Sequence, residues 1–255
     1  MKEIPSGGRR VTMRWSRAGL GMALLVITAC SSGGTAGTTE PTATSTPAPD
    51  TTTTGATPTS AGVATVVVRE PDDFGPGISA TTPASGWLLN TDVGGMFKGD
   101  VSADVGEAAI LLWSFPTGTK FYIPDDPCQS ESTLPTNPAT TAYEISSALA
   151  TQAMRDASEP VDVTIDGYTG KSLTVHVPDD VVFADCEGNT FLTYATGDDP
   201  GARYQQGPGQ IDEIWVLDVD GSIVIIDASD RPDTRAEFID EMRSIAESAT
   251  FQVVG

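Results

Sequence analysis

The sequence predicts an α+β fold, in which a single domain of residues 63–255 packs two main helices on an antiparallel sheet. Short runs of alternating apolar and polar residues, separated by Gly, Pro, Asn and Asp, predict strands and hairpins. Two other segments repeat apolar residues every three or four positions, which predicts helices. Residues 63–255 are enough for one hydrophobic core and too few for two comfortable domains.

Residues 1–29 have the form of a bacterial lipoprotein signal peptide. Basic residues precede an apolar run at 18–29, which is too short to span a bilayer. The run ends in Thr28 and Ala29 before Cys30, which resembles a lipobox. We therefore expect Cys30 to receive a diacylglyceryl group with palmitate-type chains and to become the mature N-terminus. Translation from either Met1 or Met13 fits this pattern. The basic residues are Lys2, Arg9, Arg10, Arg14 and Arg17.

Residues 30–62 are predicted to be the lipidated cysteine and a disordered linker. The stretch 31–62 is almost wholly Ser, Thr, Gly, Ala and Pro, without Lys, Arg or any aromatic residue. Such a composition buries too little apolar surface to offset the entropy of the chain. The predicted location is therefore the extracytoplasmic face of the cell membrane, with a lipid anchor and a solvated tether below the folded domain.

The charge of the chain excludes two classes of partner. Removing residues 1–29 takes away five basic residues and one acid, so the net charge falls from −21 to −25. Such a domain repels nucleic acids and anionic lipid surfaces, so the membrane is a partner through the lipid alone. Paired aspartates beside prolines predict exposed loops, and calcium binding across them stays open. These pairs are Asp72-Asp73, Asp125-Asp126, Asp179-Asp180 and Asp198-Asp199.

The cysteine count predicts one disulfide. Cys30 is the lipid site, which leaves Cys128 and Cys186 as an even pair outside the cytoplasm. Closing a loop of 58 residues stabilises a fold by about 4 kcal/mol in the chain-entropy model. His176 is the only histidine of the chain, and no CxxC pattern is present. We therefore predict no zinc site and no cofactor, and we assign no residue as a metal ligand.

Two hairpins and two shorter strands are expected in the domain. Residues 108–115 and 120–123 are apolar or aromatic runs. Strands at 161–165 and 173–177 flank Asp166-Gly167, and this hairpin is expected to bury one face. Strands at 214–219 and 222–227 flank Asp220-Gly221. Both dipeptides tolerate the positive φ angles of a two-residue turn.

Capping patterns place the two helices. The first is expected to begin at Thr141, with Glu144 completing a capping box, and to end before Pro160. The second is expected to begin at Thr234 with Glu237. Its apolar stripe of Phe238, Met242, Ile245 and Ala249 requires a sheet to cover it. We expect both helices on one face of the sheet.

The best candidate for a binding site is the segment 203–210. Arg203, Tyr204, Gln205 and Gln206 lie in a Gly/Pro-rich loop just before the second hairpin. Arg203 could pair with an anionic group of a ligand, and Tyr204 could stack on a sugar or a peptide. Gln205 and Gln206 could form hydrogen bonds with amides or hydroxyls. The structural alternative is a shaped turn in which Arg203 neutralises nearby Asp198 or Asp199. Loops held on a rigid sheet often carry function.

Several sequence motifs together carry a resemblance that covers most of residues 87–251. The chain resembles actinobacterial lipoproteins of unknown function and is distantly similar to LpqN-type lipoproteins and the PsbP-like fold. This resemblance implies a sheet flanked by helices, a binding or assembly role, and no catalytic residues to carry over. The motifs are Gly86-Trp87, residues 161–164 with Asp166-Gly167-Tyr168, residues 203–210 and residues 214–221.

No motif of a known enzyme class appears in the chain. There is no GxSxG elbow and no HExxH, and a single histidine limits Ser/His/Asp arrangements to His176. We predict a non-catalytic, lipid-anchored binding or accessory protein of the cell envelope, whose partner is an envelope protein, a wall polymer or a small ligand. A secreted hydrolase that uses loop carboxylates and a sensor domain for the state of the envelope remain alternatives.

Overall fold

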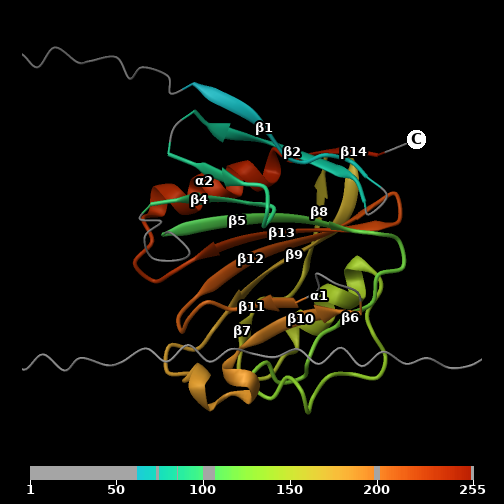
Figure 1. Ribbon diagram of the computed structural model, residues 1–255, viewed down its shortest axis with the longest axis vertical. Helices are drawn as coiled ribbons and strands as arrows, with labels where there is room; N and C mark the ends of the chain where they lie inside the picture. The colour runs from blue at the N-terminus through green and yellow to red at the C-terminus, as the bar shows by residue number, and fades with distance from the viewer. Residues whose placement is uncertain (1–61, 73–74, 85, 100–106, 198–201, 254–255) are drawn as a thin grey trace, which may run out of the picture. The chain divides into compact units, whose positions relative to one another are not determined.

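Strands dominate the fold. The computed structural model describes residues 62–72, 75–84, 86–99, 107–197 and 202–253, all within the unit Thr57–Gly255. These residues form fourteen strands in three antiparallel sheets and two α-helices (Figure 1). The predicted α+β class is therefore wrong. The predicted signal peptide, Cys30 and the predicted tether up to residue 61 lie outside the described residues.

One large sheet contains both predicted hairpins. The turns Asp166-Gly167 and Asp220-Gly221 have positive φ at all four residues, so both hairpin predictions are confirmed. Strand β8 pairs with β9 beside the main path. The path runs β3 (Leu88–Asn90), β4 (Gly95–Lys98), β5 (Ala108–Phe115), β13 (Ser222–Asp230), β12 (Ile211–Val219), β9 (Tyr168–His176) and β7 (Asp156–Ala157), and β8 is Val161–Ile165.

Two smaller sheets were not expected. Each has three strands. The first consists of β1 (Val63–Arg69), β2 (Gly77–Pro83) and β14 (Thr250–Gln252). The second consists of β11 (Ala202–Tyr204), β10 (Leu192–Thr196) and β6 (Phe121–Tyr122). Two short 3-10 turns, Phe183–Asp185 and Glu187–Asn189, precede β10.

The capping prediction is right for one helix and wrong for the other. Helix α1 (Ala142–Ala150) begins after Thr141, which forms the expected capping box with Glu144. Helix α2 (Ala236–Glu247) begins after Arg235, without a side-chain cap. The hydroxyl of Thr234 instead accepts from the backbone N–H of Arg231 and donates to the carbonyl of Glu107. Neither helix of the described residues is long and apolar enough to cross a membrane.

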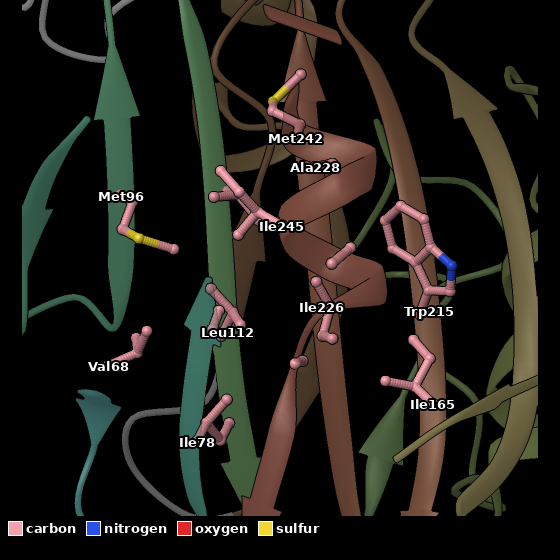
Figure 2. Packing of buried hydrophobic residues seen from close by; sticks show 14 of the residues in the cluster. Val68, Ile78, Met96, Leu112, Ile165, Trp215, Ile226, Ala228, Met242 and Ile245 are labelled. Atoms are coloured by element: carbon pink, nitrogen blue, oxygen red, sulfur yellow. The ribbon is translucent and has the colours of Figure 1, made fainter. Parts of the chain in front are cut away.

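Both faces of the large sheet are buried at its central strands. On β12, Trp215 and Leu217 pack in the core that includes Met242 and Ile245 of α2 (Figure 2). Ile214 and its neighbour Val216 point to the other face and pack in the core of α1. Figure 1 shows α2 with β1, β2 and β14 on one side of the sheet, and α1 with β6, β10 and β11 on the other.

The helices therefore lie on opposite faces, and the prediction of one shared face is wrong. The physical reason is visible in the strands at the centre of the sheet. Residues 223–226 of β13 are Ile, Val, Ile and Ile, and all four are buried. A strand that is apolar at every position requires cover on both faces.

The predicted disulfide is present. Cys128 and Cys186 are bonded, with their Cα atoms 4.5 Å apart. Around it, Val177, Val181 and Phe191 form a small third hydrophobic cluster. The bond ties the loop before α1 to the short 3-10 turns, a region with little regular structure.

Candidate groove beside the predicted binding loop

A groove of about 320 Å³ lies between β4, β5 and β11 with the segment that follows it. Its floor comes from the large sheet, and one wall comes from the segment predicted as the binding loop. The groove is therefore built on paired strands and not on a free loop. The lining residues used below are Val93, Phe97, Leu111, Trp113, Arg203, Tyr204, Gln206 and Arg231.

The floor is apolar because of strand register. Phe97 is paired with Ala109, and Gly95 with Leu111, so these positions share one face of the sheet. This is the face that farther along packs against α1. Trp113 is held by its indole N–H, which donates to the carbonyl of Val93 at 2.8 Å. The groove thus continues the hydrophobic core of the α1 side to the surface.

Burial alternates along the predicted binding loop. Arg203 and Gln205 are buried, whereas Tyr204 and Gln206 are exposed, with Tyr204 43% exposed. An extended backbone points successive side chains to opposite sides, which produces this alternation. The four predicted site residues therefore divide into a buried pair and an exposed pair, and all of them except Gln205 border the groove.

Arg203 is an internal counter-ion. Its Nε–H donates to Asp227 at 2.7 Å, and its Nη2 lies 3.5 Å from Asp212. Both aspartates are almost fully buried, as is Arg203. The structural interpretation of Arg203 is thus the better one, although its partners are not those expected. Asp198 and Asp199 lie outside the described residues.

Glutamines complete the buried network around Asp212. Gln205 donates from its side-chain amide to Thr193 and to Asp212. Gln210 donates to the other oxygen of Asp212, at 2.7 Å, and to Ser229. Gln205 is buried, its amide nitrogen donates both of these bonds, and it does not line the groove. Gln206 donates to the carbonyl of Tyr204, which fixes the exposed side of the loop.

The buried charges shift each other's pKa. Burial raises the pKa of Asp227 to about 6, with Arg203 acting against this and Asp212 adding to it. Burial disfavours the charge on Arg203, but the carboxylates of Asp227 and Asp212 outweigh that effect and raise its pKa. Burial lowers the pKa of Arg155, near the same network, to about 10. Arg203 therefore stays charged throughout the physiological range.

Asp230 makes the stability of the fold depend on pH. Burial raises its pKa to about 6, and the charges of Asp212 and Glu213 add to the shift. Because the folded pKa exceeds the unfolded value of about 3.9, this contribution to stability is complete below about pH 4 and is lost as the pH rises through 6. Asp230→Asn should flatten the decline in melting temperature between pH 4 and pH 7. Thermal unfolding with exposed Asp233→Asn as control checks this, and an unaltered pH slope in Asp230→Asn contradicts it.

The other residues considered for catalysis or metal binding contact neighbouring residues of the fold. His176 lies with Nε2 3.8 Å from a carboxylate oxygen of Asp179. Asp218 accepts the backbone N–H of Gly221 within the hairpin turn. Asp126 similarly accepts the N–H of Cys128. In the part of the chain that the structure describes, no group of three or more His, Cys, Asp or Glu is placed to hold a metal ion.

Two features of the site were not predicted from the sequence: the groove floor and the buried aspartates. The floor is formed by residues that only strand pairing brings together, so no local sequence motif predicts it. These residues are Phe97, Leu111 and Trp113. Asp212 and Asp227 did carry a signal, because each is an acid within a strand that is otherwise largely apolar. An acid at such a position requires a buried partner.

Comparisons with known proteins give distant structural matches. No protein-family model matches the chain, and no curated protein matches it. Among solved structures, LpqN of Mycobacterium tuberculosis, described as involved in cell envelope biogenesis, is 12% identical with a TM-score of 0.39, covering 74% of this chain and 91% of LpqN. The cyanobacterial PsbP of Synechocystis is 13% identical with a TM-score of 0.34. The match covers 77% of this chain and 98% of the PsbP chain. The predicted resemblance to LpqN-type and PsbP-like proteins is thus confirmed as a distant similarity.

Proposed function

We propose that this chain is a lipid-anchored, extracytoplasmic binding protein of the cell envelope, and that it acts without catalysis by holding a ligand in the groove. The observation that carries the proposal is the apolar floor of Phe97, Leu111 and Trp113 beside the exposed polar groups of Tyr204 and Gln206. Apolar concavities with a few fixed polar groups are the usual form of ligand sites.

The size of the groove favours a small ligand over an envelope protein or a wall polymer. Its volume of about 320 Å³ lies at the lower end of the range for small-molecule sites. The floor is set by paired strands, and the wall by the buried network around Arg203. A site supported in this way is organised before the ligand arrives, which reduces the entropy lost on binding.

The proposed location rests on the N-terminal sequence and the cysteines. The lipobox-like end at Cys30 supplies the anchor, and the tether of residues 31–62 separates the domain from the membrane surface. The bond between Cys128 and Cys186 suits an oxidising compartment. The acidic mature chain has no electrostatic attraction to an anionic membrane, so attachment is assigned to the lipid.

Photo-crosslinking in intact cells tests the binding function. A photoreactive phenylalanine derivative at Tyr204, beside the groove, should capture a discrete small molecule that mass spectrometry identifies. The same group at Tyr143 is the matched control, because Tyr143 is an exposed tyrosine on α1 outside the groove lining. Capture of the same species at both positions, or of none at Tyr204, contradicts the proposal.

A further inference from the structure

The geometry points to a ligand that carries one carboxylate on an apolar body, with Arg231 as the residue that pairs with the carboxylate. This inference rests on the proposed function and specifies the chemistry of the ligand. It begins with the position of Arg231, which lines the groove at the start of the turn before α2. Its Nη1 lies 3.4 Å from where a Cβ on Gly207 would be, which places the guanidinium beside the wall that carries Gln206.

Arg231 is a cation without a carboxylate partner. All nine basic residues of the mature chain lie in the described regions. Within these regions, six of them have a carboxylate oxygen within 4.0 Å: Arg69, Lys98, Lys171, Arg203, Arg235 and Arg243. Of the other three, Lys120 is exposed outside the groove lining, and Arg155 is enclosed and donates to Thr193. Arg231 alone is both unpaired and part of the groove.

The absence of a partner for Arg231 is informative because the protein is so acidic. Acids outnumber basic residues more than threefold in the mature chain, so most cations find a carboxylate. A guanidinium beside an apolar floor is screened less by water and binds a carboxylate through two parallel hydrogen bonds. The groove therefore has an internal anion contact that the protein's own acids do not occupy.

The surrounding charges limit the ligand to a single negative charge. Glu107 and Asp230 also line the groove, and the carboxylate of Glu107 is paired with Arg235 at 3.2 Å. A dianion such as a phosphate monoester would meet one free cation and the two acidic residues of the lining. Arg203 adds no free charge, because Asp227 and Asp212 neutralise it. A monocarboxylate matches the one available guanidinium.

The floor determines the rest of the ligand. Trp113 and Phe97 offer aromatic surface, and Leu111 lies between them on the same face of the sheet. Apolar surface that the ligand buries there favours binding in proportion to its area. The exposed Tyr204 and Gln206 lie at the rim, where they suit hydrogen bonds to a polar substituent. An aromatic or alkyl carboxylate fits this combination of groups.

A matched pair of probes tests the inference. 2-Naphthoate and 2-naphthamide share one ring system and differ in charge. Each is titrated, at fixed ionic strength, into residues 31–255, which lack the predicted signal peptide and the lipidated Cys30. The indole N–H signal of Trp113, assigned with Trp113→Phe, reports binding in the groove by NMR. We expect naphthoate to bind at least about tenfold more tightly than naphthamide, which is about 1.4 kcal/mol.

Variants at Arg231 decide between the possible outcomes. Arg231→Gln should bring the two affinities together, Arg231→Lys should keep part of the difference, and Lys120→Gln should leave it unchanged. Unaltered circular dichroism of Arg231→Gln establishes that its fold is intact. Equal affinities in the unmodified chain, or a preference that survives in Arg231→Gln, overturn the inference and leave the groove as a site. If neither probe moves the Trp113 signal, the proposed function itself fails at this groove.

Discussion

Replacing Arg203 with methionine should lower the free energy of unfolding by about 3 to 5 kcal/mol, the cost expected when a buried ion pair loses one partner. The substitution leaves Asp227 and Asp212 almost fully buried with no cation in contact. Urea unfolding measures the change. Arg243→Met is the matched control, because Arg243 pairs with Glu213 at the surface, where such pairs are worth about 1 kcal/mol or less.

A compensated variant separates lost charge balance from lost packing. Adding Asp227→Asn and Asp212→Asn to Arg203→Met removes the buried charges together with their partner. We expect this triple variant to be more stable than Arg203→Met alone. If Arg203→Met loses no more stability than Arg243→Met, the buried network does not have the role assigned to it.

Removing the disulfide should cost about 4 kcal/mol of stability in the chain-entropy model, because the bond closes a loop of 58 residues. The double variant Cys128→Ser and Cys186→Ser, measured by urea unfolding, should match the unmodified chain after reduction. The loop includes α1, β8 and β9, so its release extends to the α1 side of the large sheet. An unfolding midpoint that neither reduction nor the double variant changes contradicts this estimate.

Local signals in the sequence predicted the parts of the fold that depend on neighbouring residues. The Asp-Gly turns, the hairpins that they join and the capping box at Thr141 all appear in the structure. Each depends on residues within a few positions of one another. The cap at Thr234 failed because a tertiary contact, the hydrogen bond to the carbonyl of Glu107, takes its hydroxyl.

The fold class failed because long-range pairing decides it. Strands β1 and β2 are short segments rich in Val, Ala and Thr without strong alternation of large apolar residues, and β14 has only three residues. These strands form a sheet only by pairing with one another across the length of the domain. The same limit hid the second small sheet, in which the two-residue strand β6 joins β10.

The residues predicted as a binding site differ in their positions in the structure. The segment 203–210 does border the groove, and Tyr204 and Gln206 face it. Arg203 looked like a ligand contact because it is a rare cation, yet its position beside Asp227 makes it internal. Arg231 has no distinctive sequence context, and only the inventory of ion pairs in three dimensions identifies it as free.

The proposed protein is an anchored domain that works outside the cytoplasm. Mass spectrometry of the protein purified from the membrane fraction tests this most directly. Peptide mapping without reduction should find Cys30 as a diacylglyceryl-modified N-terminus and Cys128 linked to Cys186. Recovery of the chain from the cytosol with residues 1–29 still attached and all three cysteines reduced would contradict the claim.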